Sequence, residues 1–152
     1  MRRSRFRLIL CSALCVATVC LIWGNSLLDG SSSGSLSGGF SAWIGHFLPF
    51  LSPDTPNGHY LLRKCAHFSI HFLLGLETCW LMSMLSHRRV FLRTLSLCAC
   101  VAMIDESIQR FVPGRCGCVS DVVLDCCGAV CGILLLLAAV HVWRRSKHAA
   151  PQ

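Results

Sequence analysis

The side chains that could do chemistry gather near the ends of long apolar stretches. They are Lys64, His67, Asp105, Glu106, Gln109, Arg115, Asp121 and Asp125. Carboxylates beside a histidine suit acid–base chemistry, whereas lysine and arginine bind anions. A polar group inside lipid is costly and needs water, a partner or a task. We therefore treat this set as the candidate ligand-binding site, although the pattern assigns no catalytic residue.

Helical spacing predicts that these groups share faces with small residues. Two such faces follow steps of three or four: Lys64, His67, His71 and Gly75, and Asp121, Asp125, Gly128 and Gly132. Glycines let a neighbouring helix approach closely, which turns the carboxylates toward the bundle. The segment Phe111–Arg115 suits a tight turn that presents Arg115 over the cluster. We expect a mixed-charge cavity open to the outer membrane surface, with Lys64 and Arg115 contacting an anion.

The composition points to lipid as the solvent. The 152 residues are 54% hydrophobic and 14% charged, which is too apolar for an ordinary soluble domain. Stretches of the length that a spanning helix needs lie at Leu8–Leu28, Leu61–Leu85, Val90–Gln109 and Val122–Trp143. We expect a single all-α membrane domain over 1–152, with about four transmembrane helices. The first stretch resembles a signal peptide in its basic start, but its apolar run is longer, which favours an uncleaved anchor.

Charge sets the expected orientation in the cell membrane. Most lysines and arginines flank the ends of the spans that share a side with both termini, and this distribution favours cytoplasmic termini. The net charge of +7 then suits anionic lipid headgroups and requires no nucleic acid. Glu77 lies within the second span, where we expect it to pair with Ser83, Ser96 or His71, to snorkel, or to relay protons.

Between the first two spans lies the predicted outer segment 29–60. Gly30–Gly39 is typical of a flexible linker. Apolar residues in Phe40–Leu51 follow a helical period, but this stretch is too short to span the hydrocarbon. We expect a short interfacial helix on the outer side, with a loop packed on the bundle as the alternative.

Twelve cysteines do not indicate a disulfide scaffold here. Most fall inside the spans, where cysteine acts as a small apolar filler. Cys116 and Cys118 lie in a loop, one residue apart, and lack further ligands at the spacing of a zinc finger. We expect them to be unpaired, and we expect neither a metal nor a cofactor.

Ordered motifs along the chain resemble the VanZ-like family. They are Arg63–Phe68, Leu74-Gly75, Asp105–Gln109, Phe111–Arg115, and Asp121–Asp125 followed by Gly128 and Gly132. Trp23–Ser26 also looks like members from Gram-positive bacteria. One departure is Ile70 and His71, where members often have a Glu-Tyr pair. The family is similar to a protein that gives low-level resistance to the lipoglycopeptide teicoplanin, so the resemblance implies an antibiotic-resistance phenotype and not a reaction.

Three functional interpretations stay open from the residues. The first is a site at the outer leaflet that binds an anionic lipid, a lipid-linked envelope precursor or a lipoglycopeptide. The second is a structural role, in which the charges pair with each other, for instance Arg115 with Asp121 or Lys64 with Glu106, and hold helices together. The third is an intramembrane enzyme, with Glu106 or Asp121 as general base and His67 as acid or base. The chain could also form a homo-oligomer.

Overall fold

The computed structural model describes residues 2–28, 57–85 and 88–149, and this part of the chain is helical without strands. The helices are α1 (Arg2–Leu27), α3 (Gly58–Leu85), α4 (Val90–Phe111) and α5 (Val119–Ala149). Each overlaps one of the apolar stretches, so the all-α prediction is confirmed for these residues. The predicted linker Gly30–Gly39 and the interfacial helix Phe40–Leu51 lie outside the described residues.

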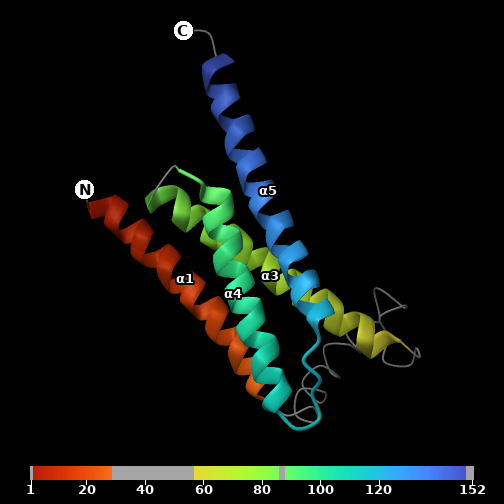
Figure 1. The fold of residues 1–152 in the computed structure, drawn as a ribbon. Helices are drawn as coiled ribbons and strands as arrows, with labels where there is room; N and C mark the ends of the chain where they lie inside the picture. Colours follow the sequence, from red (N-terminus) through yellow and green to blue (C-terminus); the bar gives the residue numbers. More distant parts are fainter. Residues whose placement is uncertain (1, 29–56, 86–87, 150–152) are drawn as a thin grey trace.

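Consecutive helices run in opposite directions. In Figure 1 the start of α1 and the end of α5 lie toward the top, and the connection between α4 and α5 lies at the bottom. Helix α1 runs along α4, while α3 crosses the bundle and packs most extensively on α5. We call the end with the 112–118 connection the loop end, and the opposite end the termini end.

Three of the helices are long and apolar enough to cross a membrane: α1 over Arg5–Leu27, α3 over Tyr60–Leu85 and α5 over Val119–Lys147. Helix α4 is not among them. Its charged residues, Arg93, Asp105, Glu106 and Arg110, leave no sufficiently apolar stretch. Length and composition thus support a membrane protein. Whether α4 also spans the membrane depends on where its charged side chains point.

Glycines set the approach of α3 to α5, as the sequence predicts. A Cβ at Gly128 would collide with the carbonyl of Phe68, and one at Gly132 with the carbonyl of Phe72. On the facing helix, a Cβ at Gly75 would collide with the backbone of Ala129. Because each glycine admits the backbone of the other helix, any larger residue must push the two helices apart.

The core is small and contains several thiols. Ile22, Leu74, Cys98 and Ala129 form a buried cluster contributed by all four helices. Further cysteines, Cys11, Cys15 and Cys79, are buried as well. All twelve cysteines lie in the described part of the chain as free thiols, ten of them within the four helices. The roles expected of them, as apolar fillers in the spans and as an unpaired Cys116 and Cys118, stay predictions.

Candidate functional site

The candidate residues meet near the loop end, where the charged turns of three helices face one another. We call the following eight residues the polar cluster: Lys64, His67, His71, Asp105, Glu106, Gln109, Asp121 and Asp125. Among these, Lys64 keeps 18% side-chain exposure, while all the others are buried. Buried charges must be paired or bonded, so the partners of each side chain determine what the cluster can do.

Lys64 of α3 forms an ion pair with Asp121 in the first turn of α5. Its ammonium also lies 5.1 Å from the centre of the Tyr60 ring. The pair that the sequence suggested for a structural role was Lys64 with Glu106, and the structure pairs Lys64 with Asp121 instead. The reason is the close crossing of α3 on α5, which brings the outermost turns of these two helices together.

One turn deeper, two histidines of α3 share one carboxylate of α5. Asp125 Oδ1 lies 3.3 Å from Nδ1 of His67 and 3.1 Å from Nδ1 of His71. The same His71 nitrogen lies 3.1 Å from the carbonyl of His67. Asp125 and His71 are fully buried, and Asp125 Oδ2 and His71 Nε2 have no hydrogen-bond partner among the described residues.

Asp105 joins α4 to α1. Its Oδ1 accepts a 2.6 Å hydrogen bond from the Ser26 hydroxyl, and its Oδ2 accepts a 2.8 Å bond from Gln109 Nε2. The Gln109 Oε1 in turn accepts a 2.8 Å bond from Arg63 Nη2. This chain of bonds runs from fully buried groups to the exposed guanidinium of Arg63, and it satisfies both oxygens of Asp105.

Glu106 fastens the connection that follows α4. Its Oε2 accepts a 2.6 Å bond from the backbone N–H of Cys118, and a Cβ at Gly117 would collide with the Glu106 carbonyl. The turn itself closes between Arg115 N–H and the Val112 carbonyl at 3.2 Å, with Gly114 at a positive φ of 74°, as its sequence predicts. Oε1 of Glu106 is buried and has no partner in the described ranges.

Arg115 binds α1 instead of any carboxylate. Its Nε donates to the Leu28 carbonyl at 3.0 Å and its Nη2 to the Asn25 carbonyl at 2.8 Å. These carbonyls lie at the end of α1, where the last C=O groups lack the usual helical donor four residues on, so the guanidinium caps them. The Asn25 carbonyl also accepts a 3.3 Å bond from the N–H of Leu28. The expected pair of Arg115 with Asp121 is therefore absent, because Asp121 pairs with Lys64. Partial burial and the nearby positive charge of Arg63 lower the pKa of Arg115 from its ordinary value.

Glu77 lies away from the cluster. Its Oε2 accepts a 2.8 Å hydrogen bond from Thr18 of α1. The partners predicted for it were Ser83, Ser96 or His71. Thr18 takes that place, and Ser83 donates to the carbonyl of Trp80 in its own helix. The Thr18–Glu77 bond ties α1 to α3 near the middle of both helices.

A comparison with protein families agrees with the motifs. The family model described as VanZ/LLP1 matches residues 10–141. The chain belongs to the VanZ/LLP1 family. No curated protein and no solved structure matches this VanZ/LLP1 chain. The family match, the long apolar helices and the buried charges together make it a VanZ-like membrane protein.

Three residues that lie in the polar cluster or bond to it were missing from the predicted set. Ser26 ends the Trp23–Ser26 motif of the resemblance, but one hydroxyl in an apolar helix does not reveal which side chain it bonds. His71 shares a face with Lys64 and His67, so its spacing could have placed it in the site. Arg63 lies one residue before Lys64 and reaches Gln109 through its long side chain, which no periodicity predicts.

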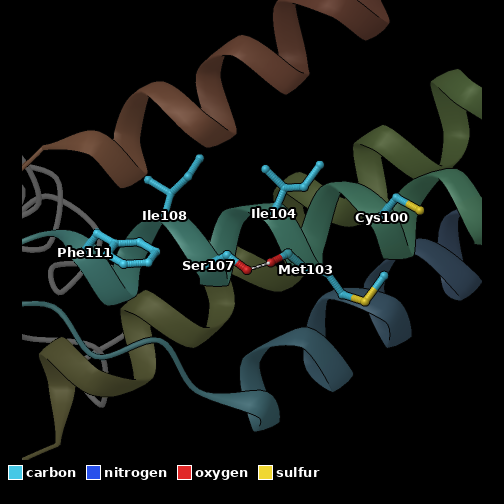
Figure 2. A pocket seen from close by; sticks show the side chains of 6 residues that line it. All are labelled: Cys100, Met103, Ile104, Ser107, Ile108 and Phe111. Atoms are coloured by element: carbon cyan, nitrogen blue, oxygen red, sulfur yellow. Dashed lines mark hydrogen bonds between the residues drawn. The ribbon is translucent and has the colours of Figure 1, made fainter.

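The polar side chains contact each other, and a separate hollow lies on the outer face of α4. Figure 2 shows six side chains along this face, which line a groove of about 370 Å³. They are Cys100, Met103, Ile104, Ser107, Ile108 and Phe111. The only polar side chain among them, Ser107, donates to the Met103 carbonyl of its own helix. The outward face of α4 is therefore apolar, whereas its carboxylates face the bundle.

Proposed function

We propose that all four described helices span the cell membrane. Helix α4 has no sufficiently apolar stretch because of its charges, yet Asp105 and Glu106 are buried against the bundle. The face that lipid would contact carries Met103, Ile104, Ile108 and other apolar groups (Figure 2). The remaining charged residues, Arg93 and Arg110, lie near the two ends of the helix, where long side chains reach the interface.

In this arrangement both termini lie in the cytoplasm and the loop end faces outward. The termini end carries a concentration of exposed basic side chains. They are Arg5, Arg7, Arg88, Arg89, Arg93, Arg144, Arg145 and Lys147. Cytoplasmic segments of membrane proteins carry such an excess, which supports this orientation.

We propose further that the loop end binds the anionic group of a membrane lipid, a lipid-linked envelope precursor or a lipoglycopeptide. The observation that carries this proposal is that two guanidinium groups are fixed beside the end of α1. Arg63 donates to Gln109, which donates to Ser26, and Arg115 donates to the carbonyl of the neighbouring Asn25. Gln109 positions Arg63, and the end of α1 positions Arg115. Like charges held together repel each other, and an anion between them removes that repulsion.

The other charges of the site serve a different purpose in this proposal. Lys64 is neutralised by Asp121, so Arg63 takes the place of Lys64 in the anion contact. Asp105 and Glu106 bond to α1 and to the 112–118 connection, which keeps both guanidinium groups in position. The cluster thus holds the helices together, and the partly exposed arginines bind the ligand.

The test is lipid binding by the purified chain in detergent, measured by native mass spectrometry with phosphatidylglycerol and phosphatidylcholine. A single lost contact between arginine and phosphate costs about 1.5–3 kcal/mol. We therefore expect an Arg63→Ala, Arg115→Ala double variant to bind phosphatidylglycerol at least about tenfold more weakly, with little change for phosphatidylcholine.

The matched control is Arg145→Ala, which removes an exposed arginine at the termini end. It is expected to keep the preference for phosphatidylglycerol. Equal losses in the control and in the double variant would contradict the proposal, because they would reflect net charge and not a site.

Teicoplanin susceptibility tests the same proposal in cells. Cells that express the wild-type chain are expected to be less susceptible than cells that express the double variant, at equal amounts of protein in the membrane fraction. The same susceptibility for both would separate the arginines from the family phenotype.

A further inference from the structure

The deeper half of the polar cluster gathers ligand atoms of the kinds that transition metals prefer. One atom from each of His67, His71 and Asp125 lies within 4.8 Å of the others, and so does one atom from each of His67, Asp105, Glu106 and Asp125. His67 and Asp125 belong to both groups. Imidazole nitrogens combined with carboxylate oxygens are typical ligands of zinc and related ions.

The distances between these atoms suit a tetrahedral ion. With metal–ligand bonds of about 2.0 Å, a tetrahedral site separates its ligands by about 3.3 Å. The Nδ1 atoms of His67 and His71 lie 3.3 Å and 3.1 Å from the same Asp125 oxygen. One ligand atom from each of the three residues lies within 4.8 Å of the other two, so the fourth corner of a tetrahedron is left for water. Binding through His71 Nδ1 requires its proton to lie on Nε2, so the ion replaces the contact of Nδ1 with the His67 carbonyl.

Unpartnered atoms on the same residues show that the hydrogen-bonding capacity of these side chains is not fully used. Asp125 Oδ2, His71 Nε2 and Glu106 Oε1 are all buried and have no hydrogen-bond partner among the described residues. Asp125 and His71 are fully buried and Glu106 is 4% exposed. Orphaned polar atoms of this kind are uncommon in proteins and call for a water or an ion.

The charges of these residues also favour a bound cation. Lys64 neutralises Asp121, whereas Asp105, Glu106 and Asp125 lie close together without a lysine or arginine bonded to any of the three in the described part of the chain. Neighbouring carboxylates in a site with little water cannot all stay ionised without a proton or a cation. Protonated histidines or a divalent cation could supply the missing positive charge.

We propose that His67, His71 and Asp125 bind one divalent transition-metal ion of the zinc class. Glu106 contributes an oxygen to the second group, and we expect its unpartnered Oε1 to accept a hydrogen bond from a water in the fourth position. Asp105 is the weaker ligand because both of its oxygens already accept hydrogen bonds. The ion reaches the site past His67 and Lys64, which keep 10% and 18% side-chain exposure. This site is separate from the arginines that contact the anion.

The experiment uses the full chain in detergent, purified through a tag without histidine, stripped with EDTA and then titrated with Co²⁺ or Zn²⁺. We expect about one tightly bound ion per chain by elemental analysis. His67→Gln and His71→Gln variants are each expected to weaken binding by at least about 100-fold. His141→Gln removes an exposed histidine of α5 and is expected to bind as the wild-type chain does.

The cobalt spectrum keeps the proposal testable even if the variants fail to fold. Cobalt bound by nitrogen and oxygen gives visible bands without the intense near-ultraviolet absorption of a thiolate. That spectrum in the wild-type chain supports the site. Thiolate absorption would assign the ion to the cysteines, and no retained ion would leave protons to balance the carboxylates; either result overturns the proposal. Neither result depends on lipid binding.

Discussion

The two ends of the bundle treat charge in opposite ways. At the loop end, Asp105, Glu106 and Asp125 are buried, and one oxygen of each bonds to another helix or to the connection after α4. At the termini end, basic side chains such as Arg93 and Arg145 are exposed. Ionisable groups inside lipid require partners, whereas those at the interface meet water and headgroups.

This difference indicates which end of the bundle holds the helices together. Lipid supplies no hydrophobic drive for helix association, so close packing and interhelical hydrogen bonds must do so. The close packing lies at the α3–α5 crossing, and most of the interhelical side-chain hydrogen bonds lie toward the loop end, with Thr18–Glu77 as an exception. We therefore expect the stability of the bundle to be sensitive to changes there and insensitive to changes in the exposed arginines.

The largest effect is expected at the α3–α5 crossing. Gly132→Val should lower the free energy of unfolding by about 3 kcal/mol, because the new side chain collides with the Phe72 carbonyl and separates the helices. The measurement is SDS-induced loss of helicity. Gly24→Val is the matched control, since a Cβ at Gly24 meets nothing within 4 Å. Equal destabilisation by both variants would show that the crossing is not specially close.

A smaller effect is expected from the ion pair between α3 and α5. A double-mutant cycle with Lys64→Met and Asp121→Asn should give a coupling energy of about 1–2 kcal/mol in the same unfolding measurement. The physical reason is that Asp121 is nearly fully buried, so removing Lys64 leaves its charge without a partner. Additive single effects would mean that the pair adds nothing to the packing.

Next comes the hydrogen bond between α1 and α4. Ser26→Ala should cost about 1 kcal/mol, since it leaves Asp105 Oδ1 without its donor in a buried position. Ser107→Ala is the control, because this exposed serine bonds only within α4 among the described residues. If the two variants have the same stability, Ser26 does not tie α1 to the cluster.

The smallest effect is expected at the termini end. Arg93→Ala should change the free energy of unfolding by less than about 0.5 kcal/mol, because the side chain is exposed. Arg63→Ala, which loses its bond to Gln109, should cost about 1 kcal/mol. A larger cost for Arg93→Ala than for Arg63→Ala would reverse the proposed difference between the ends.

The sequence predicted the helices and the faces better than the partners. Apolar length located four helices, but it measures the lipid-facing part, so α1 begins earlier and α5 ends later than the predicted spans. Helical phase correctly turned Gly128 and Gly132 toward α3. Helical phase does not reveal which of Asp121 and Asp125, one turn apart on α5, faces Lys64. That depends on how α3 crosses α5. The roles of Ser26 and Thr18 were likewise hidden, since neither residue departs from the apolar pattern of α1.

The most direct test of the central claim is the sidedness of the loop end. Cys116 and Cys118 are exposed in the 112–118 connection, so an impermeant maleimide added to intact cells should label the wild-type chain and not a Cys116→Ser, Cys118→Ser variant. Adding Ser146→Cys to that variant should restore labelling only after the membrane is permeabilised. Labelling of Cys116 and Cys118 only after permeabilisation would place the loop end in the cytoplasm and contradict an outer-leaflet site.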